Sequence, residues 1–399
     1  MTVEPRLWIN IWTLSGTILC TLTFVFSWYR ITSNYLRHLG ADPALIGWCF
    51  LIFTMANRLP GVLGGWISDR VGRKSMIVAG TFFMGVGFVG VAYAPTPALL
   101  TAALCFTWIV GSLQHPSLLA IQAESVPAAR RGVAIATVES FAMIGVTLGP
   151  LLEAKVFEWS GSSISATWRL MALSTSAVYL LVCIARLTFL RETDRRRHER
   201  TRFKPDWRRL SIPLAITVCF IGAMLITIDG PSVSLYIVDV THGNEATVGY
   251  VNFYGGALAI AAALLGGWLA DRWGAMHVMV VSAGATALFF LPFALPGTGD
   301  MHQALLALVF FPIEMFVIAN QKLIASIGPP GRRALYVGMV TTTTGIVSSW
   351  GVVISGYLYE GPDKAGPMIA AIALALISLL LTLRLLRLSA KGRDPGHLA

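Results

Sequence analysis

Long apolar runs, interrupted only by small or weakly polar residues, recur along the whole chain. Clear examples are residues 76–92, 171–185, 257–269 and 368–383. With their flanks, these runs reach the roughly 20 residues that a helix needs to cross a bilayer core of about 30 Å. The apolar positions fill each run instead of following one stripe, as they would in a surface helix of a soluble protein. The pattern therefore predicts membrane-spanning helices.

Twelve such runs fall into two sets of six, separated by a hydrophilic segment. The predicted spans are 8–29, 45–67, 75–94, 98–122, 132–152, 168–190, 211–237, 247–269, 277–296, 303–325, 335–357 and 367–383. Most connections are short, so consecutive spans run antiparallel. The expected fold is an all-α membrane protein with twelve transmembrane helices in two six-helix halves. Its expected domains are a bundle over 1–190, a basic linker over 191–210 and a second bundle over 211–399.

Composition excludes other classes of protein. The chain is 55% hydrophobic and 13% charged, whereas soluble domains are about 25% charged. The five cysteines lie in apolar segments at unrelated spacings, which indicates neither a disulfide framework nor a metal site. The sequence shows no phosphate-binding loop and no nucleophile with an obvious base. We therefore expect no cofactor, no metal and no enzyme activity.

The basic residues predict an orientation in the membrane. Of the 30 Lys and Arg, 22 fall in the even-numbered loops and at the chain ends, and five fall on the other side. Because cytoplasmic loops carry such an excess, both termini are expected in the cytoplasm. The first span is expected to be retained, since no small-residue cleavage site follows it. We expect a multi-pass protein of the plasma (inner) membrane.

The linker is the most basic part of the chain. Residues 191–209 read RETDRRRHERTRFKPDWRR. This segment is expected to rest on the anionic surface of the lipid bilayer. The net charge of +10 is explained by this topology, and no folded module surrounds the linker, so we expect no nucleic-acid partner.

The two sets of spans match each other at an offset of 202 residues. The matching segments are Gly64-Gly65-Trp66 with Gly266-Gly267-Trp268, Asp69-Arg70 with Asp271-Arg272, and Pro127, Arg130 and Arg131 with Pro329, Arg332 and Arg333. Two loops that match at one offset indicate an internal duplication. Parallel six-span repeats are an architecture of secondary transporters.

The loop between spans two and three reads GWISDRVGRK, Gly65–Lys74. It resembles the motif G-x-x-x-D-R-x-G-R-[RK] of the major facilitator superfamily at every fixed position. The second copy, Gly267–Met276, has Ala275 and Met276 in place of the basic pair. The resemblance implies the twelve-helix fold of that superfamily, with spans one, four, seven and ten around a central cavity.

The motif predicts a gate at the cytoplasmic end. Asp69 ends span two, with Arg73 and Arg130 as basic groups within its reach. An interlocked set of charges can hold a gate closed and release it when the halves rock. Gly65 is expected to let two helices approach closely, and Gly72 to permit a tight turn. The other expected gate residues are Arg70, Lys74, Asp271 and Arg272.

Two acidic residues inside predicted spans are the main candidates for transport chemistry. A charge near the bilayer centre costs about 3 kcal/mol or more, so each is a functional hypothesis by default. Glu314 lies in the middle of span ten among aromatic and apolar neighbours, which favour proton uptake near neutral pH. Asp229 precedes Gly230-Pro231, which interrupts regular helical hydrogen bonding in span seven. A structural ion pair is the alternative for both.

Further polar candidates lie in spans two, four and five. Arg58 sits near the middle of span two and needs a partner, for which Glu139 in span five is one candidate. Structural pairing and substrate contact are equal alternatives for Arg58. Gln114 and His115 lie in the inner part of span four. A histidine there is as often a satisfied polar contact as a proton carrier.

Span five contains GVTLGP at residues 145–150. Gly145 and Gly149 allow close helix packing, and Pro150 kinks or ends the span. The stretch is similar to the antiporter motif G-x-x-x-G-P-x-x-G-G of drug exporters in the superfamily, but Glu153 and Ala154 replace its final glycine pair. Span four also lacks the arginine that those exporters usually carry near its centre.

The sequence thus favours a proton-coupled secondary transporter that exports an amphiphilic compound, with Glu314 and Asp229 exchanging protons for substrate. Proton symport of a small metabolite or organic anion, recognised by Arg58 or Arg30, is the alternative. A receptor or sensor would carry a signalling domain, for which linker and tail are too short. Lipid translocation stays open. The expected partners are a small-molecule substrate, protons and the lipid bilayer, with the protein acting as a monomer.

Overall fold

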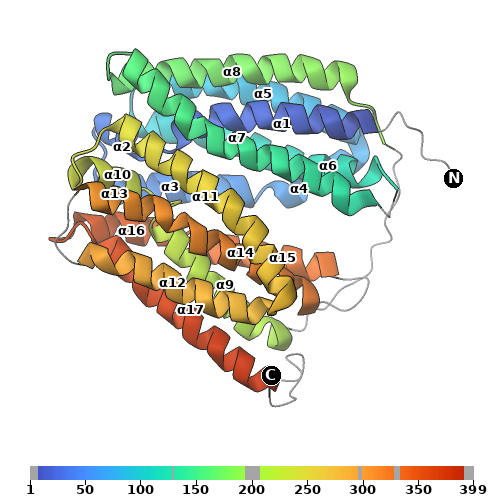
Figure 1. Cartoon of the computed structure of the whole chain (residues 1–399). Helices are drawn as coiled ribbons and strands as arrows, with labels where there is room; N and C mark the ends of the chain where they lie inside the picture. Colours follow the sequence, from blue (N-terminus) through green and yellow to red (C-terminus); the bar gives the residue numbers. More distant parts are fainter. Residues whose placement is uncertain (1–7, 128–129, 194–206, 295–298, 328–332, 391–399) are drawn as a thin grey trace. The chain divides into compact units, whose positions relative to one another are not determined.

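The computed structural model describes residues 8–127, 130–193, 207–294, 299–327 and 333–390, and every regular element among them is helical (Figure 1). The helices are α1 Trp8–Tyr29, α2 Thr32–His38, α3 Pro43–Arg58, α4 Gly61–Val71, α5 Arg73–Tyr93, α6 Pro97–Glu124, α7 Arg131–Trp159, α8 Ile164–Phe189, α9 Trp207–Ile226, α10 Ser232–Asp239, α11 Glu245–Arg272, α12 Ala275–Phe290, η3 Leu291–Ala294, α13 Gly299–Leu308, α14 Phe310–Ile327, α15 Arg333–Ser348, α16 Gly351–Glu360 and α17 Gly366–Ala390. The predicted all-α fold class is confirmed.

Ten helical stretches of the described chain are long and apolar enough to cross a membrane. The predicted spans 211–237 and 335–357 are not among them; in the structure these segments form the shorter helices α9 and α10, and α15 and α16. Ten of the twelve predicted spans therefore match a helical stretch of sufficient length, and the other two spans stay a prediction. In the opposite sense, α7 is longer than expected, since it runs through Pro150 to Trp159.

The helices form two compact units. Unit 1 holds the described residues of Met1–Ala41, Ile52–Glu199 and Glu245–Phe253, and unit 2 holds those of Asp42–Leu51, Arg200–Asn244 and Tyr254–Ala399. Each unit thus includes the first turns of one helix, α3 or α11, from the other predicted half. The predicted domain borders stay a prediction, and linker residues 194–206 lie outside the described chain.

In unit 1, α1 packs along α7 and α8, and α5 packs against α6 and α8 (Figure 1). A buried arginine joins three of these helices. Arg186 of α8, which is 2% exposed, donates to the hydroxyl of Thr17 on α1 at 3.2 Å and to that of Thr81 on α5 at 2.8 Å. These hydroxyl groups satisfy part of the hydrogen-bonding capacity of a cation that is removed from water.

In unit 2, α9 packs against α15, α16 and α17, and α12 packs against α14 and α17. Phe220 of α9 stacks on Phe316 of α14 with ring centroids 3.5 Å apart. This contact fixes α14 against α9, and both helices contribute to the acidic site described below.

A close glycine contact between two helices occurs inside each unit, at matching positions of the repeat. A Cβ atom on Gly64 of α4 would lie 2.0 Å from the carbonyl oxygen of Leu113 on α6. A Cβ on Gly266 of α11 would lie 3.1 Å from Cα of Met315 on α14. Gly64 and Gly266 are 202 residues apart, and so are Leu113 and Met315, which is the predicted offset of the repeat. The close approach that we expected at Gly65 therefore lies at Gly64, because a Cβ on Gly65 would meet only an ordinary contact at 3.9 Å.

Candidate functional site

Glu314 and Asp229 both belong to unit 2 and interact electrostatically. Glu314 is half-buried on α14, Asp229 follows the end of α9, and the charge of Asp229 acts on the Glu314 carboxyl group. Two ionised carboxylates that interact in this way repel each other. The sequence predicted that each lies inside a membrane span, and the structure adds that the charge of Asp229 acts on Glu314.

The backbone leaves the helix beside Asp229. The N–H of Asp229 donates to the carbonyl of Met224 at 3.0 Å, and α10 begins only at Ser232. The interruption that Gly230-Pro231 predicts is thus present. A Cβ on Gly230 would lie 2.1 Å from the carbonyl oxygen of Leu225, so glycine is required in this turn. Irregular backbone at membrane depth is tolerated where it is buried in protein or lines a water-filled cavity.

Arg58 lies at the end of α3 and is exposed within the described structure. Glu139 on α7 is exposed too, and no ion pair joins these two described residues. The charge of the Arg58 guanidinium acts on the imidazole of His115 on α6. Arg58 and His115 therefore form a second pair of interacting polar residues, within unit 1.

Gln114 lies in the packing between α6 and α5. Its amide oxygen accepts a hydrogen bond from Thr81 at 3.3 Å, and its amide nitrogen lies 3.1 Å from the sulfur of Met84. A Cβ on Gly80 would come within 2.8 Å of the Gln114 side chain, so the amide is enclosed on this side. These contacts place Gln114 in the packing between α5 and α6, where Thr81 also links it to the network of Arg186.

The loop motif makes the same turn in both units. Gly72, between α4 and α5, has φ 112° and ψ 149°, and Gly274, between α11 and α12, has φ 90° and ψ 144°. These backbone angles are open to glycine and strained for other residues. The tight turn predicted at Gly72 is confirmed.

Arg73 is held by an acid that the motif does not contain. Its guanidinium lies 3.2 Å from Glu124 at the end of α6 and 3.3 Å from the hydroxyl of Ser68. Thr193 donates to the same glutamate at 2.5 Å. The side chain of Asp69, the expected partner, lies outside the described residues. Arg73 therefore ties α5 to α6 and to the start of the linker.

Glu192 caps α5. Its two carboxyl oxygens accept the backbone N–H groups of Arg73 at 2.8 Å and Lys74 at 3.1 Å. Asn10 of α1 exchanges hydrogen bonds with the backbone of Arg191, at 2.8 and 3.1 Å. A carboxylate at this position satisfies free N–H groups and complements the positive end of the helix.

In the second copy of the motif, the motif supplies the acid of the ion pair and the neighbouring helix supplies the base. Asp271 at the end of α11 forms an ion pair with Lys322 of α14, and the same ammonium group donates to the carbonyl of Ala270 at 2.8 Å. In both units an ion pair thus links the loop motif to the neighbouring helix.

The remaining motif residues lie at the protein surface. Arg70 stacks on Trp66 at 3.6 Å from the ring centroid, and Arg272 lies over Trp268 at 5.4 Å. Arg130 precedes α7 and is exposed. The expected gating role of these three arginines stays a prediction.

We expect the Arg73–Glu124 pair to couple by about 1–3 kcal/mol, because both side chains are more than four-fifths shielded from solvent and share charge-assisted hydrogen bonds. The measurement is a double-mutant cycle of Arg73→Gln and Glu124→Gln on chemical unfolding of the detergent-solubilised protein. The exposed pair Lys155–Glu158 serves as the control, with an expected coupling of about 0.5 kcal/mol or less. Equal coupling in the two pairs would contradict a structural role for the Arg73 pair.

The antiporter-like stretch packs α7 onto α1. A Cβ on Gly145 would lie 2.8 Å from the carbonyl oxygen of Leu19, and one on Gly149 would lie 2.7 Å from that of Thr23. Pro150 does not end the helix. The two glycines thus lie where the helices come closest, and a role of this stretch in transport stays a prediction.

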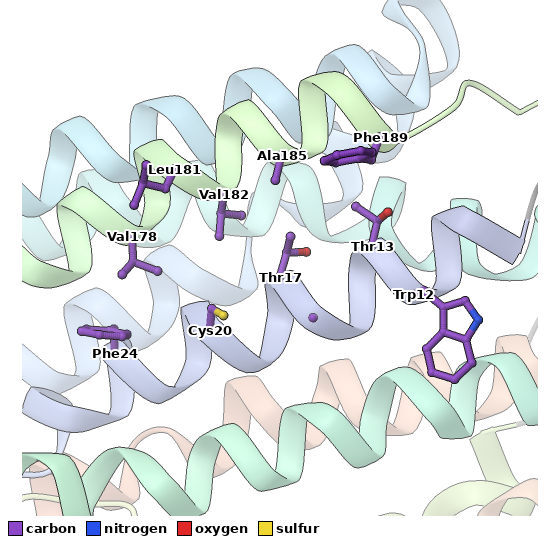
Figure 2. A pocket seen from close by; sticks show the side chains of 11 residues that line it. Trp12, Thr13, Thr17, Cys20, Phe24, Val178, Leu181, Val182, Ala185 and Phe189 are labelled. Atoms are coloured by element: carbon purple, nitrogen blue, oxygen red, sulfur yellow. The ribbon is translucent and has the colours of Figure 1, made fainter.

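An apolar groove of about 510 Å³ lies between α1 and α8 (Figure 2). It is lined by Trp12, Thr13, Gly16, Thr17, Cys20, Phe24, Val178, Leu181, Val182, Ala185 and Phe189. Nothing lies within 4 Å of a Cβ built on Gly16, so the groove is open at its middle. Its lining carries no carboxylate and no cation, so it fits an apolar chain and offers no group for a proton at neutral pH. The acidic pair in unit 2 is therefore the better candidate site.

Sequence reasoning missed Glu124 and Glu192 and did not use Lys322. One signal was available for the first two, because the first turn of α5 contains no acidic residue of its own. An acid from elsewhere in the chain was therefore to be expected at that helix end. The choice among the twenty acidic residues required the structure.

Known proteins resemble the chain over most of its length. A model of the Major Facilitator Superfamily matches residues 13–319 and 230–397. An uncharacterized MFS-type transporter of Mycobacterium tuberculosis is 26% identical over 268 residues, which are 64% of this chain and 61% of that relative. The multidrug resistance protein MdtH of Photorhabdus laumondii is 22% identical over 355 residues, 87% of this chain and 86% of the relative.

Solved structures show the same fold. A bacterial homolog to the human lysosomal transporter Spinster, in an inward-facing and occupied conformation, superposes with a TM-score of 0.77 at 14% identity. The match covers 96% of this chain and 97% of that one.

Proposed function

The chain belongs to the Major Facilitator Superfamily, and from that premise we propose that it is a transporter that exports an amphiphilic small molecule in exchange for protons. It is an integral multi-pass membrane protein. The excess of Lys and Arg in the even-numbered loops supports an inner-membrane location with both termini in the cytoplasm.

The observation that carries the proposal is the Glu314–Asp229 pair. Two carboxyl groups that share one proton can exchange it for a cationic or amphiphilic ligand, because the ligand and the proton compete for the same negative charge. Alternating access exposes the pair first to one side of the membrane and then to the other. A proton taken up outside and released inside thus drives export of the compound.

The relatives support export over uptake. MdtH, which aligns over most of this chain, is named a multidrug resistance protein. The stretch Gly145–Pro150 supports the same direction, since it matches the first part of the motif of drug-exporting antiporters. Substrates of such exporters are bound through apolar and aromatic surface more than through unique polar contacts.

Uptake of an organic anion by proton symport is the second candidate. The supporting observation is that the charge of Arg58 acts on His115 within unit 1. A guanidinium beside an imidazole suits a carboxylate or phosphate ligand, which the two groups can bind with charge-assisted hydrogen bonds.

Proton movement across proteoliposomes distinguishes the two candidates. We expect that lipophilic cations added on the side that faces the cytoplasm in the cell drive proton movement in the opposite direction. Small organic anions are expected to drive none. Protein-free liposomes correct for passive leakage. Proton co-entry with an anion, and none with a cation, would reject export and direct attention to Arg58.

A further inference from the structure

Glu153 is a fully buried acid on α7, one turn after Pro150. Among the residues that the structure describes, no hydrogen-bond partner reaches either of its carboxyl oxygens. Burying an ionised carboxylate without donors costs several kcal/mol, whereas the protonated form costs far less. The transport chemistry proposed above makes no use of this residue.

The residues around Glu153 exclude water. The first turns of α11 pack on α7, where a Cβ on Gly249 would lie 2.5 Å from the carbonyl oxygen of Pro150 and 2.9 Å from the Cβ of Ala154. Ala154, Phe157 and Ala246 form an apolar cluster at the same contact. The absence of a side chain on Gly249 therefore permits the close contact that encloses the acid.

Two charged groups from other elements face Glu153. Glu245 belongs to the first turn of α11, and Arg30 follows the end of α1. On the exposed side of the contact, Glu158 accepts hydrogen bonds from Tyr250 at 2.7 Å and from Lys155 at 3.1 Å, so these three groups satisfy one another. Glu245 repels a negative charge on Glu153, and Arg30 attracts one.

We propose that Glu153 is a second proton-binding site, distinct from the Glu314–Asp229 pair. Its carboxyl group holds one proton while the first turns of α11 are packed on α7. When they separate, water reaches the group and the proton leaves to the aqueous phase, so that the carboxylate is stabilised by hydration and by Arg30. Proton occupancy thereby reports whether this contact is closed. Only the link from this contact to transport rests on the proposed function.

Infrared spectra of the reconstituted protein at neutral pH test the proton site. We expect that Glu153→Gln removes a band from the region of protonated carboxyl groups, because glutamine matches the shape of the protonated acid and cannot bear its band. Glu158→Gln, which removes an exposed acid one turn further along α7, is expected to leave that band in place. Loss of a carboxylate band in Glu153→Gln would overturn the proposal.

Hydrogen exchange of the backbone amides in Glu245–Phe253 tests the coupling to the helix contact. At each pH, wild type is compared with Glu153→Gln, which cancels the intrinsic pH dependence of exchange. We expect the wild type to exchange at least about tenfold faster than the variant at alkaline pH and equally at mildly acidic pH, because only the wild type can ionise. Equal exchange at every pH would overturn the coupling.

A second variant perturbs the contact without touching the acid. Gly249→Ala places a methyl group against the backbone of Pro150, so α11 must move away from α7. We expect the protonated-carboxyl band of Glu153 to disappear at neutral pH in this variant, and its persistence would contradict the proposal. None of these measurements uses a substrate. A protein that shows the band and carries out no proton-coupled transport would therefore reject the proposed function and leave the proton site intact.

Discussion

Glu314→Gln is expected to abolish the proton release that lipophilic cations drive in proteoliposomes, a loss of at least about tenfold. Glutamine keeps the size of the protonated acid and cannot ionise, so the variant resembles the transporter with its proton permanently bound. The half-buried position of Glu314 and the nearby charge of Asp229 make this substitution mild for the fold. It removes one of two mutually repelling charges and creates no cavity.

Binding as a function of pH separates proton coupling from a general loss of activity. In the wild type, a bound proton and a cationic ligand compete, so affinity for the cation is expected to rise as the pH rises and the pair loses its proton. In Glu314→Gln the affinity is expected to be lower and nearly constant with pH. The direct measurement is fluorescence or calorimetric titration of the detergent-solubilised protein with a lipophilic cation.

Asp300→Asn is the matched control. Asp300 is an exposed acid in the first turn of α13, just before the predicted span 303–325 that contains Glu314. We expect this variant to retain both transport and its pH dependence. If Glu314→Gln still releases protons at the wild-type rate, coupling does not pass through Glu314, and Asp229→Asn becomes the decisive variant.

The sequence predicted this fold well because the bilayer imposes simple requirements. Runs of about 20 apolar residues must be helices, since every backbone polar group has to be satisfied within the segment. The repeat at an offset of 202 was visible because identical turns need identical residues, as at Gly72 and Gly274. The breaks in the predicted spans 211–237 and 335–357 were harder to predict. Only the first carries a Gly-Pro signal, at Gly230-Pro231.

The candidate sites were less predictable, because side-chain partners depend on helix rotation and register. An acid such as Glu314 is conspicuous in an apolar run, yet Asp229, whose charge acts on it, lies 85 residues away in sequence, after the end of α9. For the same reason Gln114, which the sequence placed beside His115 on one helix, points into the packing against α5. Adjacent residues on a helix differ by about 100° in direction, so they face different neighbours.

Gly64 and Gly65 are adjacent on α4 and face different neighbours, so alanine at each position is expected to have a different effect. Gly64→Ala places a methyl carbon 2.0 Å from the carbonyl oxygen of Leu113, so α4 and α6 must separate. We expect a destabilisation of about 3 kcal/mol or more, at the upper end of the usual cost of overpacking, and a large loss of folded protein. Gly65→Ala meets only a contact at 3.9 Å and gains helix propensity. It is expected to be neutral or to stabilise by up to about 1 kcal/mol.

The second repeat supplies an internal control for the same argument. Gly266→Ala brings its methyl carbon to 3.1 Å from Cα of Met315, where a shift of a few tenths of an ångström relieves the contact. Its cost should therefore be smaller than that of Gly64→Ala, and Gly267→Ala should behave like Gly65→Ala. Chemical unfolding in detergent and the yield of monodisperse protein measure all four variants. If Gly65→Ala proved more harmful than Gly64→Ala, the close contact of α4 with α6 would have to involve the other face of the helix.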